Sequence, residues 1–123
     1  YSHTTFITVS CAFFCATSRG ADFNKGLAAY QSGDYATALR EWRPLAEQGH
    51  DYAQNLLGRL YQEGFGVPQD NVYAPMWFNI AASNGQDYAD NGRDKIAKEM
   101  TPAQIEKAEK LASECVAKKY KGC

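Results

Sequence analysis

The segment GHDYAQN at residues 49–55 returns 36 residues later as GQDYADN at residues 85–91, with five of seven positions identical. The same offset pairs further small and aromatic residues, namely Ala38 with Ala74, Trp42 with Phe78 and Ala46 with Ala82. Upstream, the pattern Tyr-x-x-Gly at residues 30–33 matches residues 61–64 at a shorter offset of 31. A repeat of this length is typical of a helical hairpin that buries its apolar face only against a stacked neighbour. The repeat therefore predicts an α/α solenoid.

Composition supports a helical domain. From Asp22 onward the chain is rich in Ala, Leu, Glu, Gln and Lys, which favour helices, and it contains three Val, three Ile and two Thr, which favour strands. Across all 123 residues, 13 Lys and Arg balance 14 Asp and Glu to a formal net charge of -1. Binding to a phosphate backbone depends on an excess of positive charge, so nucleic acid is excluded as an expected partner. We expect one soluble, all-α domain.

Glycine and proline residues separate the expected helices. These helices cover residues 22–32, 35–48, 51–63, 71–84 and 87–100, and a last helix follows Thr101. The segment Thr101-Pro102-Ala103-Gln104 is a capping-box signal with proline at the first helical position. Asp70 is the expected N-cap of the fourth helix. Pro44 and Pro75 fall inside the second and fourth ranges, where the missing N–H is expected to kink or tighten the helix.

A longer pattern of small, aromatic and glycine residues covers residues 53–85. It reads Ala53-x-x-x-Leu57-Gly58-x-x-Tyr61-x-x-Gly64-x-Gly66-Val67-x-x-Asp70-x-x-x-Ala74-x-x-Trp77-x-x-x-Ala81-Ala82-x-x-Gly85. This pattern resembles one full copy of the Sel-one-like repeat, a relative of the tetratricopeptide repeat. Residues 26–49 resemble a tetratricopeptide-type unit, and residues 93–105 resemble the capping end of short bacterial members. The resemblance implies about three antiparallel helix pairs with a C-terminal cap.

The resemblance also assigns roles to the motif residues. Gly58 is expected to permit close helix approach, and Gly64 and Gly66 to permit a turn. The full set of expected core-motif residues is Ala53, Leu57, Gly58, Tyr61, Gly64, Gly66, Ala74, Trp77, Ala81, Ala82 and Gly85. Arg93 and Asp94 stand where Leu57 and Gly58 stood one repeat earlier, so the repeat is expected to end there. The domain, residues 22–123, then divides into a first hairpin (22–49), a full repeat (50–85) and a partial repeat plus cap (86–123).

The first helix of each pair lines the concave face in such solenoids, and its non-core positions form a candidate binding face. On the helix over residues 51–63 these positions are Tyr52, Asn55, Arg59 and Gln62, which share one face. The positions 36 residues later are Tyr88, Asn91, Lys95 and Lys98, and those on the first helix are Asn24, Ala28 and Gln31. Tyrosines, amides and cations together suit an extended peptide of acidic character. The alternative is a solvated face without a partner.

Residues 1–21 differ from the rest of the chain. Arg19 is their only charged residue when His3 is neutral, and residues 6–16 form an apolar run too short to span a membrane. Such a run is typical of a secretory signal peptide, and Ala16, Ser18 and Ala21 offer small residues for cleavage. The alternatives are a disordered leader, a buried strand or an upstream segment that is not translated. We expect an exported protein, periplasmic or secreted, without a membrane span in its mature chain.

Export would place Cys115 and Cys123 in an oxidising compartment, where disulfide bonds persist. A bond between them would close a nine-residue loop through Gly122 and contribute about 2–3 kcal/mol in the chain-entropy model. The alternative is that Cys115 is a buried small apolar residue and Cys123 a free thiol.

Enzymatic chemistry has little support in the sequence. The two histidines are His3 and His50, and CxxC, HExxH and phosphate-binding glycine motifs are absent. We predict no catalytic residue, no metal site and no cofactor. The carboxylates Glu41, Glu47 and Glu63 are interpreted as solvated helix positions.

The resemblance implies a bacterial adaptor without chemistry of its own, which binds a protein or peptide through the concave face. One alternative is a β-lactam-binding or hydrolysing enzyme, because a cysteine-rich branch of the family is linked to β-lactams. Paired cysteines pin each hairpin in that branch, whereas residues 22–100 contain no cysteine. The other alternative is a structural subunit that associates with copies of itself.

Overall fold

The computed structural model describes residues 21–85 and 87–123, including the side chains of all of these except residues 87–91. The signal peptide predicted over residues 1–21 lies outside the described residues apart from Ala21. In the described part of the chain every regular element is an α-helix, which confirms the all-α prediction. The helices of this part are α2 (Phe23–Ser32), α3 (Tyr35–Glu47), α4 (Asp51–Glu63), α5 (Tyr73–Ser83), α6 (Asp87–Ala97) and α7 (Pro102–Ala117). None of these described helices is long and apolar enough to cross a membrane.

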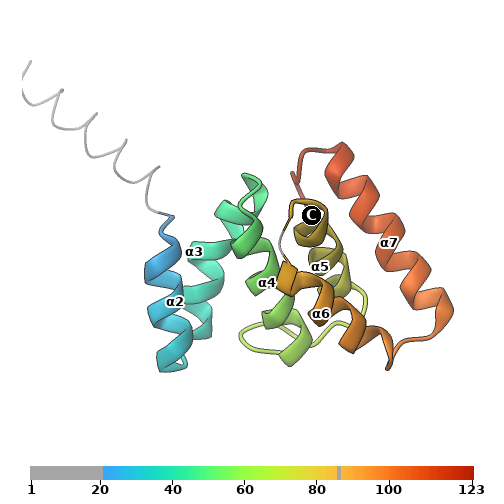
Figure 1. Ribbon diagram of the computed structural model, residues 1–123. Helices are drawn as coiled ribbons and strands as arrows, with labels where there is room; N and C mark the ends of the chain where they lie inside the picture. The colour runs from blue at the N-terminus through green and yellow to red at the C-terminus, as the bar shows by residue number, and fades with distance from the viewer. Residues whose placement is uncertain (1–20, 86) are drawn as a thin grey trace, which may run out of the picture.

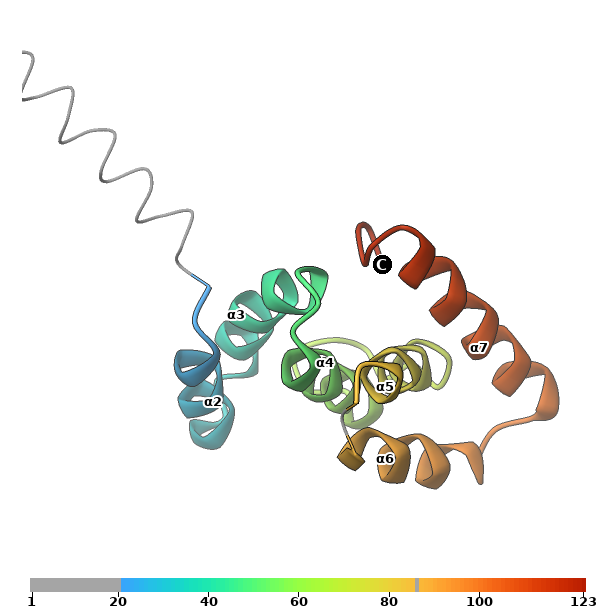
Figure 2. The same ribbon diagram turned by 45° about the horizontal axis from the view of Figure 1, so that its top comes forward.

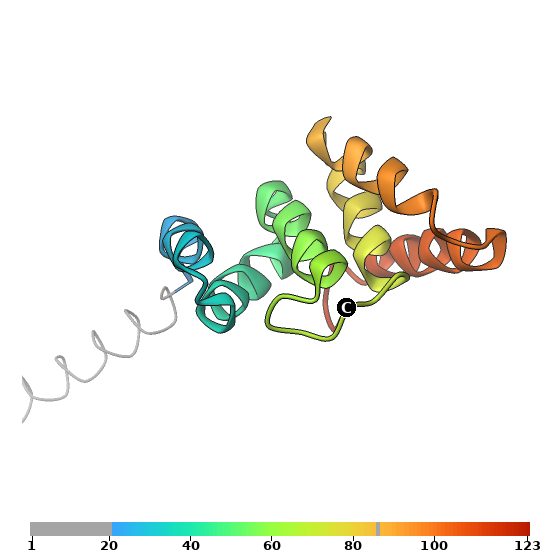
Figure 3. The same cartoon turned by 90° about the horizontal axis from the view of Figure 1, so that it is seen from below.

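The helices follow one another along an elongated body (Figure 1). Each packs on its neighbour in sequence from α2 to α6, whereas α7 packs on α5. In Figure 2, α2 and α6 lie on the lower side of the body, and α3 and α7 lie on the upper side. The loop between α4 and α5 projects from one edge (Figure 3). Contacts between helices that are close in sequence therefore build most of the fold.

Asp22 and Glu41 fix the beginning of α2. The Asp22 side chain accepts hydrogen bonds from the backbone N–H groups of Asn24 and Lys25, at 2.9 and 3.2 Å, and so caps the helix. The Asp22 N–H donates to Glu41 Oε1 at 2.9 Å, and Lys25 Nζ lies 3.7 Å from Glu41 Oε2. Glu41 is only 6 % exposed. The interpretation of Glu41 as a solvated position is therefore wrong, because its carboxylate ties α3 to the start of α2.

The fourth expected helix begins later than predicted. Asp70 Oδ1 accepts hydrogen bonds from the N–H groups of Val72 and Tyr73, at 2.9 and 2.8 Å. These bonds form a turn, so α5 begins at Tyr73 rather than at Asn71. Pro75 then lies in the first turn of α5, where backbone N–H groups have no intrahelical acceptor. Pro75 therefore removes no hydrogen bond from α5, and the reason for the kink or tightening expected at this residue does not apply.

The fifth expected helix ends earlier than predicted, at Ala97 rather than at Met100. The N–H groups of Glu99 and Met100 donate to carbonyls three residues back, at 3.0 and 3.1 Å, which replaces the helix by a turn. Pro44 does lie inside a helix, in α3.

The contact between α2 and α3 depends on a glycine. A Cβ atom at Gly26 would lie 2.8 Å from Trp42 Cδ1, so the indole packs on the backbone of α2 only because Gly26 lacks a side chain. Trp42 is fully buried, and its Nε1–H donates a hydrogen bond to the carbonyl oxygen of Phe23 at 3.2 Å. This single side chain joins the first two helices by both packing and hydrogen bonding.

Phe78 of α5 occupies a similar position between two glycines. A Cβ atom would lie 2.8 Å from Phe78 Cε1 if placed at Gly58 of α4, and 3.1 Å from it if placed at Gly92 of α6. The 36-residue offset matched Gly58 with Asp94, but the glycine of α6 that lies against the ring is Gly92. Close packing therefore continues into α6, although the sequence pattern predicts that the repeat ends there.

The core-motif residues divide by burial. The buried ones are Ala53, Leu57, Gly58, Ala74, Trp77 and Ala81. Tyr61 and Ala82 are half-buried. The remaining glycines lie in turns with positive φ, at 72° for Gly64, 77° for Gly66 and 91° for Gly85. Small residues and Trp77 thus fill the interior, and glycines form the turns.

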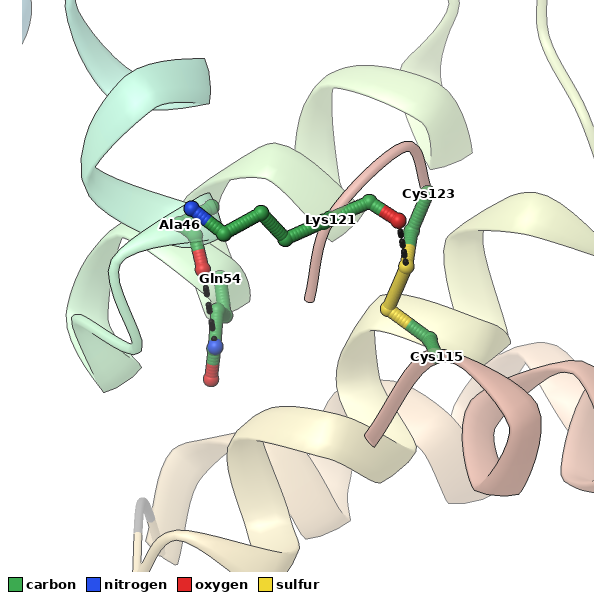
Figure 4. The surroundings of a disulfide bond; sticks show 5 residues. All are labelled: Ala46, Gln54, Cys115, Lys121 and Cys123. Atoms are coloured by element: carbon green, nitrogen blue, oxygen red, sulfur yellow. Dashed lines mark hydrogen bonds between the residues drawn. A yellow bond between two sulfur atoms is a disulfide. The ribbon is translucent and has the colours of Figure 1, made fainter. Parts of the chain in front are cut away.

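The chain after α7 folds back into a short loop. A disulfide bond joins Cys115 to Cys123, whose Cα atoms are 5.8 Å apart (Figure 4). The sequence alone is compatible with either this bond or two unpaired cysteines, and the structure contains the bond. Lys119 and Tyr120 within the loop adopt positive φ angles of 57° and 67°.

Tyr120 anchors this loop to the earlier helices. Its ring would lie 3.3 Å from a Cβ atom at Gly49, and its hydroxyl donates to Asn84 Oδ1 at 3.2 Å. Asn84 Nδ2 donates to Gln54 Oε1 at 2.8 Å. Gln54 Nε2 in turn donates to the Ala46 carbonyl at 3.0 Å, a bond that Figure 4 shows. A chain of hydrogen bonds therefore connects the C-terminal loop with α5, α4 and α3.

Replacing Thr101 with Ala is expected to lower the free energy of unfolding by about 1 kcal/mol. Thr101 Oγ1 accepts a hydrogen bond from the Gln104 N–H at 3.2 Å, and Gln104 Oε1 accepts one from the Thr101 N–H at 3.0 Å. The variant loses half of this capping box. Urea denaturation followed by circular dichroism measures the change. Ser113→Ala, an exposed change inside α7, is the control, and equal effects of the two changes would contradict the prediction.

Candidate peptide-binding groove

A groove lies between α2 and α4. Its first part is a pocket of about 330 Å³ with a mainly apolar lining. The residues that line it are Phe23 and Leu27 of α2 and Tyr52, Asn55, Leu56 and Arg59 of α4. Tyr52 is 49 % exposed, an unusual position for a large aromatic side chain. We call this part the apolar pocket.

The groove continues toward α6 as a second pocket of about 350 Å³. Its lining residues are Tyr30 of α2, Arg59, Gln62 and Glu63 of α4, Phe65 of the following loop, and Gly92 and Lys95 of α6. Arg59 lines both pockets, so the two are adjacent. We call the second part the charged pocket. Every second helix, namely α2, α4 and α6, therefore contributes to this pair of adjacent pockets.

The α2 residues in this groove are not those that the sequence predicted. Gly26 and Ala29 are the buried residues of α2, and Gly26 faces Trp42 of α3. The neighbouring stripe, at spacings of four and three residues, is Phe23, Leu27 and Tyr30, and it turns toward α4. The predicted positions Asn24, Ala28 and Gln31 are exposed and line neither pocket. The offset of 31 residues assigns the wrong face of α2 to the groove, because it does not account for the close contact between Gly26 and Trp42.

Aromatic contacts hold the walls of the groove. The Phe23 ring stacks on His50 with centroids 5.1 Å apart and meets Tyr52 edge-on at 6.0 Å. His50 is itself fixed, because its Nδ1 accepts the Ala53 N–H at 3.2 Å and caps α4. Aromatic pairs of this kind prefer such offset and edge-on arrangements. The apolar pocket is thus bounded by side chains that already pack on one another.

A second aromatic cluster bounds the charged pocket. Phe65 stacks on Tyr35 with ring centroids 4.3 Å apart, and Tyr30 meets Tyr35 edge-on at 5.6 Å. Gly66 follows Phe65 with a φ of 77°, and a Cβ atom there would lie 3.2 Å from the Tyr35 carbonyl oxygen. Both the positive φ angle and the short distance to the Tyr35 carbonyl oxygen require a glycine at this position.

Asn55 lies between these walls with unmet hydrogen-bonding capacity. Its side chain is 6 % exposed, and Asn55 Oδ1 has no hydrogen-bond partner within the described part of the chain. A buried polar atom without a partner costs about 1–3 kcal/mol. Buried unsatisfied groups in native proteins are rare and call for an explanation. Its place in the lining of the apolar pocket suggests a ligand as that explanation.

The charges around the groove are mainly positive. The charged side chains in the lining of the charged pocket are two cations, Arg59 and Lys95, and one carboxylate, Glu63. Neither cation forms an ion pair with a described residue. Lys98, which directly follows α6, is exposed. Lys25 of α2 is already paired with Glu41. The groove therefore favours an anionic group next to Arg59.

The predicted binding-face residues have different outcomes. Tyr52 and Arg59 are exposed and line the groove, and Gln62 is half-buried and lines it. Lys95 lines the charged pocket, whereas Lys98 is exposed outside both pockets. Asn55 lies in the lining, but it is buried rather than solvated. The side chains of Tyr88 and Asn91 lie outside the described residues.

Several lining residues were missed from the sequence. They are Phe23, Leu27, Tyr30, Leu56, Glu63, Phe65 and Gly92. The spacing of Phe23, Leu27 and Tyr30 is a detectable signal, because residues four and three apart share a helix face. Phe65 gives no such signal, since it lies in a loop.

Two titratable groups outside the groove have displaced pKa values. Burial, assisted by the neighbouring Tyr61, raises the pKa of the Tyr73 phenol. The Thr37 side-chain and backbone hydrogen bonds lower the pKa of Asp34. In the part of the chain that the structure describes, no group of three or more His, Cys, Asp or Glu side chains is arranged to hold a metal ion. Neither displaced group belongs to the candidate site.

Comparison with protein-family models and with curated proteins finds no match to this chain.

Proposed function

We propose that this protein is a non-enzymatic interaction module that binds an extended segment of a protein or peptide in the groove formed by α2, α4 and α6. The observation that carries the proposal is that the apolar and charged pockets lie next to each other across three helices and share Arg59. A groove that combines exposed aromatic residues with arginine has the composition of energetic hot spots in protein interfaces.

We further propose that the chain is a Sel-one-like repeat protein with α/α-solenoid architecture. Two features support this proposal. The turns at Gly49 and Gly85, one repeat apart, have nearly equal φ angles of 92° and 91°. Trp42 packs against Gly26, and Phe78, 36 residues later, packs against Gly58. Equivalent turns and equivalent helix contacts are what a stacked repeat requires.

The disulfide bond supports export as the proposed localisation. Disulfides persist in secreted and periplasmic proteins and are rare in the reducing cytosol. The Cys115–Cys123 bond is therefore consistent with the proposal that residues 1–21 direct the chain out of the cytoplasm.

Changing Tyr52→Ala together with Arg59→Ala is expected to weaken partner binding by about thirtyfold or more, because both side chains resemble interface hot spots. A photo-cross-linking amino acid in place of Gln62, which lines the charged pocket, reports binding in an extract of cells that express the protein. A covalent adduct between residue 62 and the partner should form when the rest of the chain is native. It should be absent when the chain also carries the double change. Far-UV circular dichroism should stay unchanged, because both residues are exposed.

Two matched controls accompany this experiment. The cross-linker at Val116, an exposed apolar residue of α7, should give no adduct. The double variant Val116→Ala with Lys110→Ala removes one apolar and one cationic side chain away from the groove, and it should leave the adduct at residue 62 intact. No adduct at residue 62, or equal adducts at 62 and 116, would contradict the proposal. A product of twice the mass of the chain would instead support the self-associating subunit.

A further inference from the structure

The geometry of the groove points to a partner segment with two adjacent features. We infer that an extended peptide places one apolar side chain in the apolar pocket and, close to it in sequence, an Asp or Glu carboxylate beside Arg59 and Lys95. This inference rests on the proposed function, because it names the chemistry that the same groove would select. The two features are expected next to each other in the peptide because Arg59 lines both pockets.

The apolar pocket selects a side chain by burial. Phe23 and Leu27 form one wall, and Tyr52 and Leu56 form the other. A Leu, Ile, Met or Phe side chain that leaves water for such a pocket contributes about 1.5–3 kcal/mol. The aromatic contacts of Phe23 with His50 and Tyr52 already exist in the free protein. The pocket therefore needs little rearrangement, which favours binding.

Asn55 selects the backbone of the bound segment. Its amide offers both an acceptor and donors, and a half-turn of the amide exchanges the two. With Oδ1 turned to the pocket, the amide can accept a hydrogen bond from a peptide N–H of an extended ligand. That bond would remove the cost of the unsatisfied Oδ1. A bound peptide N–H thus accounts for a buried polar atom that has no partner in the described part of the chain.

The charged pocket selects the acidic residue. Of the charged side chains in its lining, Arg59 and Lys95 are cationic and Glu63 is anionic. Lys25 on α2 is engaged by Glu41, and Asp51 at the start of α4 is not part of either lining. A carboxylate beside Arg59 can accept two parallel hydrogen bonds from the guanidinium. The positive charge of the remaining cation, Lys95, then offsets the negative charge of Glu63.

The shared position of Arg59 sets the spacing of the two features. An extended chain advances about 3.3 Å per residue. Because Arg59 belongs to both linings, the carboxylate is expected about one to three residues from the apolar side chain. Either order along the peptide satisfies this spacing.

A displayed library of random octapeptides, panned against the full chain with its disulfide intact, tests this inference. Enriched peptides should carry an apolar residue with an acidic residue within three positions. For a synthetic peptide of that pattern, replacing its acidic residue by the matching amide should weaken binding about tenfold, as expected for a hydrogen bond to a charged group. Raising the salt concentration should weaken the acidic peptide more than the amide peptide.

Three variants assign the selectivity to residues. Arg59→Gln and Lys95→Gln should each reduce the preference for the acidic peptide over the amide peptide. Lys107→Gln, an exposed cation on α7, is the charge-matched control and should leave the preference intact. Asn55→Leu should weaken both peptides equally, since it removes a contact to their common backbone.

The outcomes separate this inference from the proposed function. Enriched peptides without an acidic preference, or a preference that persists in Arg59→Gln and Lys95→Gln, would overturn the inference and leave peptide binding standing. An adduct at residue 62 without any enriched peptide would overturn the inference and also the extended form of the partner, and it would leave only the proposal of an interaction module standing, since the partner would then be a folded surface. Failure of both the adduct and the enrichment would overturn the proposed function as well.

Discussion

Replacing Trp42 with Ala is expected to lower the free energy of unfolding by about 3–5 kcal/mol, the range measured for deletion of a large buried aromatic side chain. The indole is fully buried and lies against the backbone of α2 at Gly26. Its removal leaves a cavity at the contact between α2 and α3 that the neighbouring backbone cannot fill. Because small domains are stable by about 5–15 kcal/mol, the variant is expected to be close to unfolding.

Chemical denaturation followed by circular dichroism measures this loss, and two phenylalanine variants refine it. Trp42→Phe removes the hydrogen bond from Nε1 to the Phe23 carbonyl. Trp77→Phe removes an indole N–H that has no hydrogen-bond partner in the described part of the chain. Trp42→Phe should therefore cost about 1 kcal/mol more than Trp77→Phe. Equal costs, or a Trp42→Ala variant as stable as the native chain, would show that Trp42 does not hold the first hairpin.

Removing the disulfide bond by Cys115→Ser with Cys123→Ser is expected to lower the free energy of unfolding by about 2.5 kcal/mol. Cys115 and Cys123 are 8 positions apart in the sequence, and closing a loop of this size restricts the unfolded chain. The native loop also holds Lys119 and Tyr120 at positive φ, which is unfavourable for residues other than glycine. Without the bond, the loop is expected to detach and take Tyr120 away from Asn84.

Thermal or urea unfolding of the native chain with and without reducing agent should reproduce the effect of the double variant. Tyr120→Phe is the matched control. It keeps the bond and the ring contact at Gly49 but loses the hydrogen bond to Asn84, so it should cost about 0.5–1.5 kcal/mol. If the double variant and the reduced chain unfold like the native, oxidised chain, the loop contributes nothing to stability.

Several parts of the fold could be predicted because they depend on local chemistry. The capping box at Thr101 uses residues three positions apart, and the structure contains both of its hydrogen bonds. The helix over residues 51–63 lies between a capping residue and a glycine, and its bounds match α4. The predicted start of α5 is too early because Asp70 forms a turn before the helix instead of capping it. An aspartate at this position is compatible with either role, so the sequence does not distinguish them.

The candidate site depends on contacts between helices, which the sequence pattern describes less well. Tyr52, Arg59 and Gln62 follow from spacing on one helix, and the structure brings them into one groove. The α2 side of the groove depends on the rotation of that helix, which Gly26 determines through its contact with Trp42. Burial of Glu41 has a similar origin, because its partner is the N–H of Asp22, nineteen residues away. Neither contact has a periodic signal in the sequence.

The order in which the helices pack has a consequence for the rate of folding. Because α2 to α6 each pack on the next helix along the chain, most native contacts close short loops, and loop closure costs little entropy at short range. Helical proteins of such low contact order fold in microseconds to milliseconds. Tyr120 is different, since it bonds to Asn84 36 residues earlier and lies against Gly49. The body is therefore expected to fold first and the tail to dock on it afterwards, in a step slowed further when the disulfide bond must still form.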